Sequence, residues 1–468
     1  MKASFKKVAA VVLLVALSAT WFVGCSKGSD KDEQGRTIIS TCNYPAVEGD
    51  ARDIYDEKIE AFMKENPDVN IQPSEYFFNV STFYAKAEAG QLPADIHVNY
   101  TEAAPSITAG YVADISDVAK KYDFYDKINP AVMEVISRDG KLYAIPASCY
   151  ALGLVFNAKL FKQAGLVNAD GSYKLPRTWD EVVEYGKIIK EKTGAAGYIT
   201  PTTGNAGGWL FTPVAWSFGV DFMEQDKDGK WHATFDTPEA VAALQFMKDL
   251  KWKHNLIPAN VLLDNSTAEQ EFYAGNAAMM IRSPESLYSI ANYGANNNDF
   301  GVTVMPAGPK RHVTLLGGGI RVFNSKLTDD QLDAAVRWVK WDFSPDLSES
   351  TKKYIDDKYA LYEEQGKAIG MQVLSPWSED TEAVMYEREV VRKYMNIEEA
   401  NVKEYNDFAM GLAYQDIEIQ PEEPVCAQEL YEILDGLLQE VFTNKDADCA
   451  ALIKGANNDL QNNYLDYL

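Results

Sequence analysis

Residues 37–98 read TIISTCNYPAVEGDARDIYDEKIEAFMKENPDVNIQPSEYFFNVSTFYAKAEAGQLPADIHV, and this stretch decides the fold. Short β-branched runs alternate in it with longer segments whose apolar residues recur at helical spacing. The pattern predicts strands at 37–42, 69–72 and 95–98 and helices at 55–63 and 82–89. A β-α-β-α-β order is typical of a mostly parallel sheet with helices on its faces, and therefore of an α/β fold.

Polar and aromatic residues follow the predicted strands where each strand ends. Asn43 and Tyr44 follow the first strand, and Asn99 and Tyr100 follow the third. Ligands of parallel α/β sheets bind outside the carboxyl ends of the strands. We therefore expect these four residues to face a binding site.

Helix starts are well marked further along the chain. Thr178-Trp-Asp-Glu181 and Thr328-Asp-Asp-Gln331 each match a capping box, and Thr237-Pro238 places proline at a first helical position. Residues 226–229, DKDG, predict a hairpin turn, because the later acidic ligands of a calcium loop are missing. An amphipathic helix is expected over 425–441.

The composition limits the classes of partner. A chain of 468 residues predicts two to four domains, and 46% hydrophobic residues exclude an intrinsically disordered chain. Acidic residues (69) outnumber basic ones (44) and give a formal net charge of −25, which argues against nucleic-acid binding. Neutral or cationic ligands stay open, and the large net charge favours a soluble monomer.

The N-terminus predicts export. Lys2, Lys6 and Lys7 precede the apolar run 8–23, which has the layout of a signal peptide and is too short to span a bilayer. The run ends Gly24-Cys25 before a polar tract, and this resembles a bacterial lipobox in which Cys25 is lipidated. Cleavage without lipidation, after a small residue of the run, is the alternative.

The other cysteines and the histidines predict little chemistry. Four further cysteines in so long a chain make no disulfide framework, and a Cys426–Cys449 bridge would need a hairpin-like return of the chain. No CxxC occurs, and the four histidines lie without metal-ligand spacing. We expect no metal site and no cofactor.

Several landmarks together resemble one family. The chain is similar, in their order and spacing, to the extracellular solute-binding proteins of bacterial ABC importers, in the sugar-binding branch that includes maltose-binding protein. The segments that carry this resemblance are 61–69 (AFMKENPDV), 90–95 (GQLPAD), 139–146 (DGKLYAIP), 154–157 (LVFN), 272–279 (FYAGNAAM) and 317–320 (GGGI).

The resemblance implies two α/β lobes joined by crossover strands, which close like a clamp on a ligand and present the closed form to a membrane permease. A lipid anchor would hold such a receptor on the extracytoplasmic face of the cell membrane, near its permease. The implied division is a signal peptide at 1–24, the lipidated Cys25 with a flexible tether at 25–36, a first lobe at 37–147 and 311–343, and a second lobe at 148–310 and 344–468.

The same resemblance implies site residues. Tyr150 follows the hinge strand at a position that faces the ligand in this family, and Trp209 lies where an aromatic ring of the second lobe stacks on sugar. Arg282 ends the family's Ala-Met-x-Ile strand, and Glu285 stands where a stacking Trp is expected. Trp377 lies on a loop in the family's variable region and is a further candidate.

Four hypotheses about the function compete. A receptor for an oligosaccharide leads, because aromatic rings and polar side chains suit sugars. A receptor for a polyamine or another cationic solute is the alternative, because Glu285 in place of the Trp could bind either sugar hydroxyls or a ligand amine. A lipid-anchored glycoside hydrolase or a purely structural lipoprotein has less support, because no motif for other chemistry is present and no catalytic residue is assigned.

Overall fold

A computed structural model describes residues 30–468 of the chain. The expected signal peptide (1–24) and the expected lipidation site, Cys25, lie outside the described residues. Within 30–468, none of the helices combines the length and the apolar character needed to cross a membrane. Residues 30–36, expected as part of a flexible tether, are hydrogen-bonded to the first strand, since the amide of Ile38 donates to the carbonyl of Asp30 over 2.8 Å.

The first lobe is built on the stretch that opens the fold. Strand β1 (Thr37–Thr41) lies between β2 (Val69–Pro73) and β3 (Asp95–Asn99), and both pairings are parallel, as predicted. Helix α1 (Asp50–Glu65) and helix α2 (Val80–Glu88) connect these strands. The apolar stripe of α1 packs on the core through the buried Ile59 and Phe62, and the helix ends before Pro67, as predicted.

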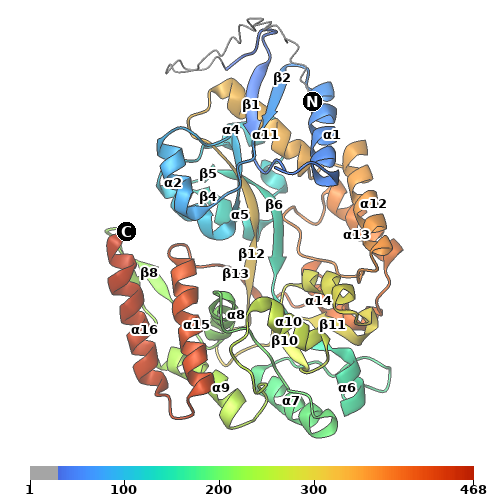
Figure 1. The fold of residues 1–468 in the computed structure, drawn as a ribbon, viewed down its shortest axis with the longest axis vertical. Helices are drawn as coiled ribbons and strands as arrows, with labels where there is room; N and C mark the ends of the chain where they lie inside the picture. Colours follow the sequence, from blue (N-terminus) through green and yellow to red (C-terminus); the bar gives the residue numbers. More distant parts are fainter. Residues whose placement is uncertain (1–29) are drawn as a thin grey trace, which may run out of the picture.

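Two long strands connect the lobes. Strand β6 (Ala144–Ala151) pairs antiparallel with β12 (Val313–Phe323), and β12 also pairs antiparallel with β3 and parallel with β13 (Glu418–Pro421). Figure 1 shows β6 and β12 running between an upper part that contains β1 and α1 and a lower part that contains α7 (Trp179–Thr193) and α9 (Pro238–Trp252). The chain therefore has the two-lobe architecture that the resemblance implied.

Three consecutive glycines let the long strands cross closely. A Cβ atom on Gly317 would collide with the ring of Tyr150, one on Gly318 with the carbonyl of Ser148, and one on Gly319 with the ring of His97. Only glycine leaves room for this approach. The GGGI segment thus fixes how the crossing strands pack.

The second lobe has a smaller sheet of a different kind. Strand β7 (Gly153–Asn157) lies between β10 (Met279–Arg282) and β11 (Phe300–Thr303), and both pairings are antiparallel. The expectation of mostly parallel pairing therefore holds for the first sheet and is wrong for this one. The physical reason is that β7 runs out of the hinge directly into the sheet, while its two neighbours return toward the hinge.

The helices of both lobes begin largely where the sequence indicated. The side chain of Thr178 caps α7 by accepting a hydrogen bond from the backbone amide of Glu181. The carboxylate of Glu181, however, accepts from the backbone amide of Arg177 and not from that of Thr178, so the capping box is incomplete. Thr328 and Gln331 do form the complete box of α11 (Asp329–Asp342). Residues 226–229 form the turn between β8 (Met223–Gln225) and β9 (Trp231–Ala233), as predicted.

The C-terminal segment is divided between several packing partners. Helices α12 (Glu349–Glu364) and α13 (Glu382–Tyr394) share a small core of their own, while α15 (Ala427–Thr443) and α16 (Cys449–Asn463) belong to the core of the second lobe. Trp377 packs instead against Phe124 of the first lobe, with ring centroids 6.3 Å apart. Residues 344–468 thus contact both lobes, and the expected lobe boundaries stay predictions.

All four described cysteines are free. Cys426 precedes α15 and Cys449 begins α16, so the whole of α15 separates the two thiols. A helix of 17 residues is about 25 Å long, whereas bridged cysteines have Cα atoms within about 7 Å. The Cys426–Cys449 bridge considered from sequence is thus excluded by the length of α15.

Candidate functional site

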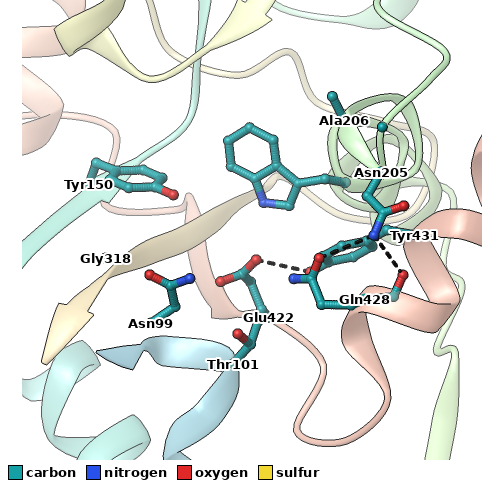
Figure 2. Close-up of a pocket in the computed structure, with 11 residues that line it drawn as sticks. Asn99, Thr101, Tyr150, Asn205, Ala206, Gly318, Glu422, Gln428 and Tyr431 are labelled. Carbon is teal, nitrogen blue, oxygen red and sulfur yellow. Dashed lines mark hydrogen bonds between the residues drawn. The ribbon is translucent and has the colours of Figure 1, made fainter. Parts of the chain in front are cut away.

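A cavity of ≈280 Å³ lies where the two lobes meet. The first lobe, the crossing strands and the second lobe all contribute to its walls (Figure 2). Its lining residues are Asn99, Thr101, Tyr150, Gly204, Asn205, Ala206, Trp209, Gly318, Glu422, Gln428 and Tyr431.

Aromatic rings form one side of this cavity. Tyr150, on β6, meets Trp209, on α8 (Ala206–Ser217), edge to face with ring centroids 6.4 Å apart. Tyr431, on α15, adds a third ring. Burial raises the pKa of Tyr150 well above its ordinary value, so its hydroxyl stays protonated and able to donate. The rings offer flat apolar faces beside hydrogen-bonding groups.

The start of α8 is held by a carboxylate from α15. Asp435 accepts from the backbone amides of Asn205 and Gly208, each over 2.7 Å. A Cβ atom on Gly207 would meet Asp435 at 2.7 Å, and one on Gly208 would overlap the backbone of Tyr431. The Gly-Gly pair therefore lets α8 approach α15 closely, and this contact positions Trp209 at the cavity.

Glu422 is the one acidic side chain among the residues that line the cavity. It follows β13 directly, and its Oε1 accepts from the hydroxyl of Tyr431 over 3.0 Å (Figure 2). Burial raises the pKa of Glu422 to about 7, against the lowering effect of its hydrogen bonds with Tyr431 and Trp209. The carboxyl can thus donate or accept near neutral pH.

Small polar groups complete the walls. Asn99 and Thr101 come from the end of β3 and the turn after it, and the amide of Asn205 donates to the carbonyl and side-chain oxygens of Gln428 over 3.1 and 3.2 Å. None of the described lining residues is Lys or Arg. Residues 30–468 also contain no group of His, Cys, Asp and Glu placed to hold a metal ion.

The structure places three of the nine residues expected from sequence at this cavity: Asn99, Tyr150 and Trp209. Three others from the strand ends do not line it. Asn43 contacts His97, Tyr44 donates to Asp56 over 3.0 Å, and Tyr100 is buried with its hydroxyl donating to Ser148 over 3.0 Å.

The remaining three expected residues also lie outside the cavity lining. Arg282 is buried and paired with Glu269, so its charge is already neutralised within the second lobe. Trp377 is only 5% exposed because it packs into the core beside Phe124. Glu285 lies in the first turn of the 3₁₀ segment Pro284–Tyr293, which follows β10, and burial raises the pKa of its carboxyl.

Sequence reasoning missed the part of the site that comes from the last quarter of the chain. Glu422, Gln428 and Tyr431 lie far from Trp209 in sequence, and the pairing of β13 with β12 brings them to the cavity. A signal was present in the segment 420–424, QPEEP, where two carboxylates stand between prolines beside an amphipathic helix.

The sequence is similar to curated binding proteins. The sn-glycerol-3-phosphate-binding periplasmic protein UgpB of Escherichia coli K12 is 27% identical over 279 residues, 56% of this chain and 60% of that protein. The chain thus spans about 60% of the length of the curated relatives it matches.

Solved structures share the fold over nearly the whole chain. Maltose-bound MalE3 of Thermotoga maritima superposes with a TM-score of 0.60 at 23% identity, covering 91% of this chain and 98% of that one. UgpB of Mycobacterium tuberculosis in complex with glycerophosphocholine gives 0.64 at 16% identity, covering 91% and 98%. A substrate-binding protein of Listeria monocytogenes in complex with cycloalternan gives 0.64 at 18% identity, covering 92% and 99%.

A sequence model describes the family of bacterial extracellular solute-binding proteins. It matches residues 48–346, which include β2 and β3 of the first lobe, the crossing strands β6 and β12, and the three strands of the second-lobe sheet. This match covers more than half of the chain, and the protein therefore belongs to the bacterial extracellular solute-binding proteins.

Proposed function

We propose that the protein is the receptor of an ABC importer, which captures a carbohydrate outside the membrane and delivers it to a permease by closure of its lobes. The observation that carries the proposal is the interlobe cavity, in which Tyr150, Trp209 and Tyr431 lie beside Glu422. A ligand there contacts both lobes at once, so its binding free energy favours the closed form.

The chemistry of the cavity suits a neutral sugar. The faces of a pyranose ring are apolar C–H surfaces that pack on aromatic rings, and its hydroxyls need donors and acceptors at the edges. Trp209 and Tyr431 supply such rings, and Asn99 and Glu422 supply hydrogen-bonding groups.

A phosphate ester is a poorer fit, although the relatives from Escherichia coli are named for sn-glycerol-3-phosphate. A buried phosphate dianion needs cationic partners or several amide donors. The described lining residues include neither Lys nor Arg, and Glu422 would repel the anion whenever it is ionised.

A cationic solute is the second candidate. Glu422 lies among three aromatic rings, and a carboxylate beside aromatic faces is a typical site for an ammonium group. A cation would hold Glu422 ionised and so release a proton near pH 7, where the carboxyl is otherwise partly protonated.

Hydrolysis of the sugar has little support. A glycosidase needs two carboxyl groups about 5 to 10 Å apart across the scissile bond. Glu422 is the one carboxyl among the described residues that line the cavity. We therefore assign the site to binding without a catalytic step.

The proposed location of the receptor is the extracytoplasmic face of the cell membrane. A lipid on Cys25 would hold a monomeric receptor close to its permease and raise its effective concentration there. Metabolic labelling with a radioactive fatty acid tests this part, with Cys25→Ala as the unlabelled control.

A thermal-shift screen tests the ligand class. The mature chain from Ser26 onward is heated with mono-, di- and oligosaccharides, polyamines and glycerol phosphates. A ligand at 100 times its Kd stabilises by about 2.7 kcal/mol, which moves the midpoint visibly. A shift with one sugar series supports the proposal, and a shift with polyamines alone would replace the sugar by a cation.

Trp209→Ala then tests the site. We expect at least tenfold weaker binding of the responding ligand, because the stacking face is lost, with the midpoint of the ligand-free protein nearly unchanged. Trp252→Ala is the matched control, since Trp252 is 38% exposed on α9, outside the cavity lining. Equal affinity in wild type and Trp209→Ala would contradict the assignment.

A further inference from the structure

A groove of ≈760 Å³ adjoins the cavity and also lies between the lobes. Its first-lobe wall comes from α2 and α3 (Ala103–Thr108), and its second-lobe wall from the turn and second strand of the β8–β9 hairpin and the start of α15. Thr101 and Gln428 line both the groove and the cavity, so the two spaces meet at these residues.

The two walls of the groove each carry an aromatic ring. Tyr84, on α2, is half-buried and held by Phe83 and Tyr111, whose ring centroids lie 5.2 and 5.9 Å from its own. Trp231, on β9, is half-buried against the core of the second lobe. Both rings are thus fixed by their neighbours while part of each faces the groove.

The hairpin that carries Trp231 is itself well ordered. The amide of Asp226 donates to the carbonyl of Lys230 over 2.8 Å, and the side chain of Asp226 contacts the ring of His232 over 2.8 Å. The hairpin therefore holds Trp231 in place before a ligand binds, and little conformational entropy is lost when a ligand packs on this ring.

Carboxyl groups from both lobes line the groove. Glu102 comes from the first lobe and Glu429 from the second, and both line the groove. Burial raises the pKa of Glu102, and the nearby charge of Glu429 raises it further. Hydroxyl groups of a sugar placed between them would donate to both carboxyls and relieve this repulsion, which favours closure over an extended ligand.

We propose that the cleft binds a linear oligosaccharide lengthwise, with one end at Trp209 in the cavity and the distal units in the groove between Tyr84 and Trp231. The inference rests on the proposed carbohydrate-binding function and names the substrate class more narrowly. The groove is more than twice as large as the cavity, and the cavity alone lies just below the usual ligand-site range of about 300–1,000 Å³.

The dependence of affinity on the length of the sugar tests this assignment. Calorimetric Kd values are measured for the wild type with the di-, tetra- and hexasaccharides of the malto-, cello- and xylo-series. In the series that binds, we expect the hexasaccharide to bind at least tenfold more tightly than the disaccharide, because it alone reaches the groove.

Two variants remove the aromatic rings of the groove. Tyr84→Leu and Trp231→Leu keep apolar bulk but lose the flat ring, and each is expected to weaken hexasaccharide binding about tenfold while changing disaccharide binding less than twofold. Tyr354→Leu and Trp252→Leu are the matched controls, because these two exposed rings lie outside both the groove and the cavity. Thermal midpoints without ligand check that every variant folds.

The outcomes separate the two levels of the proposal. The groove assignment is wrong if the groove variants lose the same affinity for short sugars as for long ones. It is also wrong if the affinity of the wild type does not rise with the length of the sugar. Either result would leave the carbohydrate function in place. If neither the wild type nor Trp209→Ala binds any of the sugars, both the groove assignment and the proposed carbohydrate function are wrong.

Discussion

The two walls of the cavity differ in what they offer a ligand. The first-lobe wall consists of Asn99 and Thr101, small polar side chains at the end of one strand. The second-lobe wall carries the rings of Trp209 and Tyr431 on two helices that pack closely together. Apolar contact is thus concentrated on the second lobe, and the first lobe adds mainly hydrogen bonds.

This difference suggests a division of labour during capture. Burial of flat apolar surface supplies most of the affinity, so we expect the ligand to rest first on the second lobe. The hydrogen bonds of the first lobe form only when the lobes approach, and they stabilise the closed form specifically. The aromatic wall would then determine the affinity for the ligand, and the polar wall would determine how far the ligand favours the closed form.

The largest effect is expected where the aromatic wall is anchored. In Gly208→Ala the new Cβ would overlap the backbone of Tyr431, so α8 and α15 must separate. We expect the free energy of unfolding to fall by about 3 kcal/mol or more, because a backbone neighbour cannot rotate away. Urea unfolding measures the change, and ligand affinity should fall with it as Trp209 moves.

Gly436→Ala is the matched control within the same helix pair. Gly436 lies in α15, and a Cβ atom there would have open space around it. Alanine is the better helix former by about 1 kcal/mol, so this variant should be neutral or more stable. Loss of stability in Gly436→Ala as large as in Gly208→Ala would mean that close packing of the two helices is not what anchors the wall.

The second effect concerns the carboxyl between the two walls. The folded state raises the pKa of Glu422 from 4.5 to about 7, so between these values it binds more protons than the unfolded state does. Its contribution to stability is therefore present at acidic pH and lost as pH rises through 7. Each pKa unit corresponds to about 1.4 kcal/mol, so the contribution reaches about 3 kcal/mol.

Glu422→Gln tests this linkage, because glutamine keeps the shape and stays neutral. We expect the change in unfolding free energy between pH 5 and pH 8 to be smaller in the variant than in the wild type by up to about 3 kcal/mol. Glu364→Gln, which replaces an exposed carboxyl at the end of α12, outside the cavity and the groove, serves as the control. An unchanged pH profile in Glu422→Gln would show that the carboxyl is ionised and solvated in the folded state.

The smallest effect is expected on the polar wall. Asn99 is exposed, and truncation to alanine removes at most one or two hydrogen bonds to the ligand. A net hydrogen bond is worth about 0.5–1.5 kcal/mol, so affinity should fall between about two- and tenfold, less than in Trp209→Ala. Calorimetry compares the two variants directly, and a greater loss in Asn99→Ala would reverse the proposed roles of the walls.

Local sequence patterns predicted the elements well and the site only in part. The alternation over 37–98 and the cap at Thr328 depend on near neighbours, and the structure confirms both. The family resemblance named Tyr150 and Trp209 as candidates, and both line the cavity. These features share short sequence separations or a recognisable motif.

The rest depends on contacts between distant segments. Trp377 looked like a site residue because it lies on a loop, but Phe124 of the first lobe buries it in the core. Glu422 and Tyr431 reach the cavity only because β13 pairs with β12, a parallel pairing across about 100 residues of chain. No local signal distinguishes a loop tryptophan that packs inward from one that meets a ligand.

The arrangement of the thiols gives the protein a practical use as an optical sensor. Cys426 is half-buried and lines the groove, whereas the other three described cysteines are buried. Burial and the neighbouring Glu429 raise the pKa of the Cys426 thiol to about 11, so attachment of a maleimide dye proceeds best at alkaline pH. A fluorophore at this position would stand at the rim of the cleft and change its emission as the lobes close, which turns the receptor into a reagentless fluorescent probe for whatever it carries.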